Sequence, residues 1–115
     1  PGLCRDVEEA AGKLAVKIAF RCVDPAALPL AEQVSAAAES AVAVANHGTV
    51  SYIALFMRAG ALVSVGIAPL KEGHVLLQMG HVAVLYLEVH RVAAELPGIL
   101  SLALARAAQL RRALL

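Results

Sequence analysis

Apolar runs separated by short breaks dominate the middle of the chain. The runs span residues 49–57, 61–68 and 74–79, and the two breaks, 58–60 and 71–73, each end in glycine. Runs of this length joined by tight glycine turns predict an antiparallel meander of three strands. Apolar residues fall on both faces of the predicted strands, so we expect this sheet to be covered on two sides.

The pattern then changes to a helical period. Over residues 81–96 the apolar positions recur every three or four residues, which predicts an amphipathic helix with its charged residues on the opposite face. Val84 and Leu87 lie on that charged side. They are either scattered exposed residues or part of a contact surface.

Two more helices are predicted on either side of this region. Pro29 opens one over residues 30–46, and its apolar stripe consists mostly of alanine. This stripe reflects either the high helix propensity of alanine or a face that packs closely on a sheet or on a second copy of the chain. The other helix spans residues 98–115, after Pro97-Gly98. It either docks on the domain, pairs with a second copy or lies on a membrane surface.

The first 24 residues allow two interpretations. Asp6 and Glu9 have the spacing of a capping box, so a helix begins there. Residues 7–23 form either one helix with charges spaced by four, or a short helix followed by a strand near 14–23, where apolar and polar residues alternate. We favour the helix followed by the strand.

Together these elements predict a single domain over residues 1–115, of the α/β (α+β) class. An antiparallel sheet that contains the meander at 49–79 is packed by helices at 30–46, 81–96 and 98–115. The alternative is an all-α bundle in which residues 49–79 are helical.

The composition adds a surplus of apolar residues. Of the 115 residues, 60% are hydrophobic and 17% are charged, against about 45–50% and about 25% in ordinary globular chains. This surplus predicts an interface with another chain or with a membrane. The longest uncharged run, 40–57, is interrupted by Asn46-His47-Gly48, so we expect no transmembrane span.

Charge and cysteine content bear on partners and compartment. The net charge of +1 gives no general attraction to nucleic acid, and no apolar signal segment opens the chain. Cys4 and Cys22 lie 18 residues apart without a CxxC motif. We therefore expect free thiols and a cytoplasmic protein.

The four histidines are the strongest candidates for chemistry. His47, His74, His81 and His90 form no HxxxH or HExxH motif, so a structural or solvated role is favoured for each. The chain also has no glycine-rich phosphate loop and no nucleophile elbow. We predict no catalytic residue, no metal and no cofactor. His74 and His81 are an alternative ligand site, because they flank one predicted strand and the turn after it.

The order of elements between residues 29 and 96 resembles the C-terminal half of Roadblock/LC7-type domains. The similar parts are the alanine-rich helix that ends near Ala45, the segment Tyr52-Ile53-Ala54-Leu55-Phe56-Met57 with its glycine turn, the runs 61–68 and 74–79, and the helix that contains Tyr86-Leu87-Glu88-Val89-His90-Arg91. Those modules have a five-stranded antiparallel sheet between helices. The resemblance implies a non-enzymatic homodimer or heterodimer that scaffolds or regulates a small GTPase.

The apolar surplus without a catalytic motif predicts a non-enzymatic interaction or scaffold module. Its partner is a second copy or a paralogous subunit and, through the resemblance, a small GTPase. The predicted interface residues are Leu30, Val34, Ala37, Ala41, Tyr52, Val84 and Leu87. The alternative is a small oligomeric enzyme or ligand-binding protein with a histidine-containing site at a subunit interface.

Overall fold

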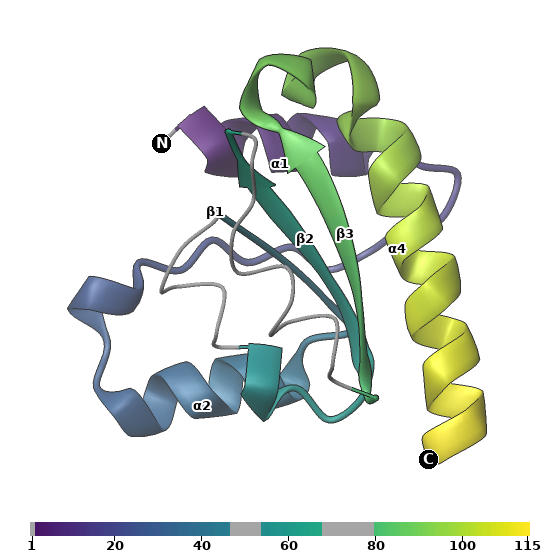
Figure 1. Ribbon diagram of the computed structural model, residues 1–115. Coiled ribbons are helices and arrows are strands. Elements are labelled where there is room, and N and C mark those ends of the chain that lie inside the picture. Colours follow the sequence, from purple (N-terminus) through teal and green to yellow (C-terminus); the bar gives the residue numbers. More distant parts are fainter. Residues whose placement is uncertain (1, 47–53, 68–79) are drawn as a thin grey trace.

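A computed structural model describes residues 2–46, 54–67 and 80–115 (Figure 1). Helices lie on both faces of a small sheet, and α4 runs the length of one face. The elements in chain order are α1 (Gly2–Gly12), the 3₁₀ turn η1 (Pro25–Ala27), α2 (Leu30–Glu39), β1 (Val42–Asn46), β2 (Gly60–Gly66), β3 (Val82–Glu88), the 3₁₀ turn η3 (Val89–Arg91) and α4 (Val92–Leu114).

The three described strands form one parallel sheet in the order β1-β2-β3. Val42 of β1 lies beside Ala61 of β2, and Gly60 of β2 lies beside Val82 of β3. The predicted antiparallel meander is therefore wrong, and so is the all-α alternative. Glycine turns favour hairpins between strands that are adjacent in sequence, whereas parallel neighbours are joined by longer crossovers.

Among the described residues, the middle run of the predicted meander forms a strand at its expected place. β2 occupies Gly60–Gly66, with Val63 and Val65 on one face and Leu62 on the other, as expected. The end of the first run, residues 54–56, forms a 3₁₀ turn. The rest of that run and the whole run at 74–79 lie outside the described residues.

β1 occupies the second part of the predicted helix 30–46. The helix ends at Glu39, and Ser40 takes extended backbone angles after it. From there valine and alanine alternate, so Val42 and Val44 face α1 and α4 while the alanines between them face α2. The alternation of a β-branched and a small residue fits a strand better than a helix.

β3 replaces the first part of the predicted helix 81–96. Leu85 and Leu87 of this strand point into the core beneath α4, whereas Val82 and Val84 point toward α2. The apolar face that the helical period predicted is thus divided between two sides of a sheet. Because almost every residue of this run is apolar, it satisfies both periods.

Helix α4 continues through Pro97 and Gly98, where the sequence predicted a break between two helices. Proline removes one main-chain hydrogen bond from a helix interior. Leu96, Leu100 and Ala103 of α4 are buried against the sheet. This burial offsets the lost hydrogen bond, because tertiary packing contributes most of the stability of a helix in a protein.

The core has two parts, one on each face of the sheet. α1 and α4 cover the face that carries Val63, Val65 and Leu87. α2 and the turn at 54–57 cover the other face, where Ala37, Ala54, Met57, Leu62 and Val82 are buried together. Both faces of this sheet are therefore covered by elements of the same chain.

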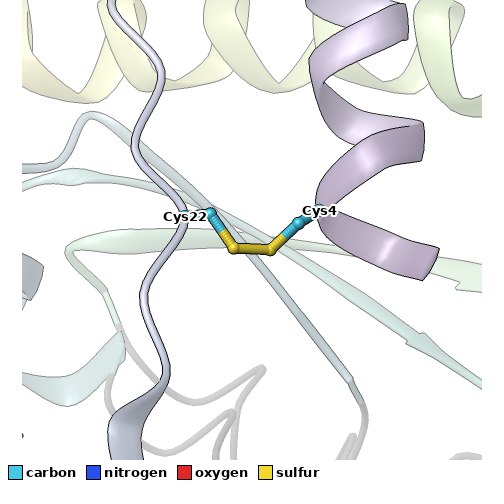
Figure 2. Close-up of a disulfide and its surroundings, with 2 residues drawn as sticks. All are labelled: Cys4 and Cys22. Carbon is cyan, nitrogen blue, oxygen red and sulfur yellow. A yellow bond between two sulfur atoms is a disulfide. The ribbon is translucent and has the colours of Figure 1, made fainter. Parts of the chain in front are cut away.

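Residues 13–24 form neither a helix nor a strand, so the predicted strand near 14–23 is wrong. The chain turns back after α1, and Cys22 of this segment forms a disulfide with Cys4 of α1 (Figure 2). The two Cα atoms are 5.9 Å apart, a normal separation for a disulfide. The expectation of free thiols is wrong, because it considered only the spacing along the sequence.

Arg111, in the last turn of α4, joins three elements. Its Nε donates a hydrogen bond to the carbonyl oxygen of Ala59 at 2.8 Å, and its Nη2 donates one to that of Ser40 at 3.2 Å. Ser40 is the C-cap of α2, and Ala59 precedes β2. The guanidinium therefore supplies donors and positive charge at the carboxyl end of α2, where the helix dipole favours a cation.

We expect Arg111→Met to lower the free energy of unfolding by about 2 kcal/mol, because two carbonyl groups lose a charged donor. Urea denaturation followed by circular dichroism measures this loss. Arg112→Met is the matched control, since Arg112 is exposed on the same turn, and its effect should stay within about 0.5 kcal/mol. Equal losses in the two variants would contradict the role assigned to Arg111.

Candidate functional site

The predicted interface residues are mostly parts of the core. Ala37 and Leu87 are buried, and Val34, Ala41 and Val84 are partly buried. Leu30, at the start of α2, has 69% of its surface exposed. Tyr52 lies outside the described residues. Of the predicted set, Leu30 is the one described residue whose side chain is exposed.

The histidine pair predicted as an alternative ligand site has one described member. His81 precedes β3, and its Nε2 lies 3.3 Å from the carbonyl oxygen of Leu55. This contact joins the start of β3 to the turn at 54–57. His74, like His47, lies outside the described residues.

A charged cluster marks the carboxyl end of β3, an edge where parallel sheets commonly bind ligands. His90 Nε2 lies 3.2 Å from Glu88 Oε2, and Arg91 Nε lies 3.9 Å from the same oxygen. Arg91 Nη1 also lies 3.6 Å from Glu95 Oε1. These side chains are exposed, and Arg91 lies near the carboxylates of both Glu88 and Glu95. Such surface pairs contribute little free energy and satisfy one another.

Metal binding requires a denser group of ligands than this cluster offers. Within residues 2–46, 54–67 and 80–115, no three or more His, Cys, Asp or Glu side chains form a group that could hold a metal ion.

A hollow of about 160 Å³ lies between α1 and α4 and is lined in part by Asp6, Glu9 and Lys13. This volume is smaller than the roughly 300 Å³ at which small-molecule sites begin.

The turn at 54–57 presents two adjacent large apolar side chains to solvent. Leu55 is 49% exposed and Phe56 is 47% exposed. Their neighbours Ala54 and Met57 are buried against α2 and the sheet, and the amide of Met57 donates to the carbonyl oxygen of Ala54 at 3.1 Å. Ala54 and Met57 thus hold the turn in place, while Leu55 and Phe56 remain about half exposed. In Figure 1 it lies beside the carboxyl-terminal half of α2.

The sequence interpretation missed this pair because it assigned residues 49–57 to a strand. One signal was present: Ala54 and Met57 are three residues apart, the spacing at which one turn of helix places two side chains on the same side. Read that way, Leu55 and Phe56 between them must point outward.

Comparisons with protein families, with characterised proteins and with solved structures found no match. Among the described residues, no helix is long and apolar enough to cross a membrane.

Proposed function

We propose that this chain is a non-enzymatic interaction module that forms a homodimer, with Leu55 and Phe56 at the centre of the contact. The exposed pair on a fixed turn carries this proposal. Large apolar side chains at the centre of an interface supply most of the binding free energy, and phenylalanine is enriched there. A turn that is already ordered also loses little conformational entropy on binding.

The surroundings of the pair suit a two-fold contact. The carboxyl-terminal part of α2, beside the turn, contains the partly buried Ala36 and Ala38 before Glu39. Small residues allow another backbone to approach closely. Glu39 at the end of α2 and Arg58 after the turn are both exposed. If a two-fold axis passes through the pair, we expect Arg58 of one copy to lie near Glu39 of the other, so that opposite charges meet.

We propose a second copy rather than the other partners expected from the sequence. The Roadblock/LC7 resemblance implies a small GTPase, but that family has an antiparallel sheet and the described sheet is parallel. The fold therefore adds no support for a GTPase partner. The cytoplasmic location was inferred from free thiols, and the disulfide removes that reason.

We expect the wild-type chain to elute with twice its mass of 11.9 kDa in light scattering at micromolar to millimolar concentrations. Replacing both Leu55 and Phe56 with serine should give a monomer with an unchanged circular dichroism spectrum, because both side chains are already exposed. The matched control replaces Leu102 and Leu114, two exposed leucines of α4, with serine and should remain dimeric. A monomeric wild-type chain, or equal dissociation of the control, would overturn the proposal.

Charge reversal tests the geometry of the contact separately. Arg58→Glu and Glu39→Arg should each weaken dimerisation about tenfold, because each places like charges opposite one another. The double variant should recover most of the affinity, since the pair is restored with exchanged signs. Additive losses in the double variant would reject the proposed two-fold arrangement.

A further inference from the structure

The segment 13–24 is attached to the rest of the fold mainly by its disulfide. The side chains of residues 15–17 and 19–22 are exposed. Leu14 is the last residue of this stretch that packs against the core beneath α4. Within the described part of the chain, no main-chain hydrogen bond joins residues 15–23 to another element. Segments with few buried contacts and few hydrogen bonds have the lowest local stability in a protein.

Helix α1, which carries Cys4, packs more firmly on the rest of the fold than the segment 13–24, which carries Cys22. Val7 and Ala10 of α1 are buried against α4 and the sheet. α1 therefore keeps its place through its own packing, independently of Cys22. Figure 2 shows Cys4 on the helix and Cys22 on the extended chain that passes beside it.

The bond is accessible to a thiol reagent. Cys22 is exposed, whereas Cys4 is partly buried. Exchange requires a thiolate to reach one sulfur along the S–S axis, and exposed disulfides are the ones that thiols reduce most readily. The Cys22 sulfur is the accessible point of attack.

A hollow of about 360 Å³ lies between the end of α1 and the segment. Its lining includes Leu14, Val16, Ile18 and Phe20 of the segment, Ala11 of the helix and the charged residues Glu8 and Lys17. Because the segment supplies most of this lining, release of the segment would open the hollow.

We propose that Cys4–Cys22 is a reversible redox switch that docks or releases residues 13–24 while the rest of the fold stays intact. A thiolate of the glutathione class attacks Cys22 Sγ, the S–S bond breaks, and Cys4 leaves as a thiolate that takes a proton. A second thiol attacks the mixed disulfide on Cys22, which releases the Cys22 thiol and the oxidised form of the reductant. Two protein thiols and one small disulfide thus replace one protein disulfide and two small thiols, a transfer of two electrons. Oxidised glutathione reverses the step.

Site-resolved proteolysis of the full chain tests this switch. Lys17 and Arg21 lie inside the loop closed by the disulfide, and both are exposed. After equilibration in glutathione buffers of different ratio, trypsin should cut after these residues about tenfold faster in the reduced chain, because the disulfide is the main attachment of this segment and its loss lets the backbone enter the protease. Cleavage after Arg106, within α4, should not change. Samples are reduced after quenching and analysed by mass spectrometry, so that fragments joined by the disulfide are counted.

Three measurements decide the outcome. Alkylation without reductant should leave both cysteines unlabelled, and labelling should follow the glutathione ratio reversibly. Replacement of both cysteines with serine should give fast cleavage in every buffer, with the circular dichroism of the wild type. Thiols that alkylate in the oxidised chain, equal cleavage at Lys17 and Arg21 in both states, or faster cleavage at Arg106 on reduction would each overturn the proposal. This proposal does not rest on the proposed dimer. The same measurements can be made at concentrations at which the chain is monomeric.

Discussion

Gly60→Ala should lower the free energy of unfolding by about 3 kcal/mol, at the upper end of what overpacking costs. A Cβ atom at this position would overlap the carbonyl oxygen of Ala41 and would lie 2.9 Å from Met57 Cε. The backbone has no room to move away. The amide of Ala61 donates to the same Ala41 oxygen at 2.9 Å, and the amide of Gly60 donates to the carbonyl oxygen of His81 at 3.1 Å. One methyl group therefore disturbs the junction of all three described strands.

Gly98→Ala is the matched control for this substitution. Gly98 lies within α4, and a Cβ atom there meets nothing within 4 Å. Alanine is favoured over glycine in a helix by about 0.5–1 kcal/mol, so this variant should be more stable than the wild type. Urea midpoints that move in opposite directions would support the close approach at Gly60. A neutral Gly60→Ala variant would show that β1 and β2 do not meet as described.

Leu87→Ala should lower the free energy of unfolding by about 3 kcal/mol, as expected for a leucine removed from a packed core. Only 1% of Leu87 is exposed, and it packs with Val63 and Leu96 between the sheet and α4. The sequence pattern placed the same residue on the outer side of a helix, as part of an interface. On that interpretation the substitution would weaken dimerisation and leave the monomer stable.

Val89→Ala is the matched control for Leu87→Ala. Val89 follows β3 directly and is 52% exposed, so its truncation should change stability by less than about 0.5 kcal/mol. Stability from urea denaturation and mass from light scattering are measured on the same samples. A large loss of stability in Leu87→Ala with unchanged association would confirm the buried strand. Unchanged stability with lost association in Leu87→Ala would show that Leu87 lies at an interface on the surface.

The sequence predicted elements correctly where only one period of apolar residues, that of a helix or that of a strand, was compatible with the residues. The helix after Pro29 begins at Leu30, and the alternation after Gly60 forms a strand with the expected faces. The apolar stripe that includes Leu100 and Ala107 belongs to a helix docked on the sheet. In each case capping residues or a regular period left little choice.

The functional surface was predictable only in kind. The apolar surplus indicated a contact surface, but the exposed pair Leu55 and Phe56 was hidden in a presumed strand. Most of the residues chosen for the interface, among them Ala37 and Leu87, serve the core instead. Sequence periodicity identifies which residues share a face. It does not say whether that face meets another part of the chain or another molecule.

The sequence by itself determined that apolar residues would occupy both sides of a sheet near residues 61–66. It also determined that one helix would begin near Leu30 and that another would occupy the last residues of the chain. The tertiary structure decided that residues 42–46 and 82–88 are strands, that all three described strands are parallel, and that Cys4 meets Cys22. The physical reason is the same in each case. Strands and disulfides depend on partners that lie far along the chain, and short runs as uniformly apolar as Val82–Leu87 satisfy a helix and a strand equally until those partners are in place.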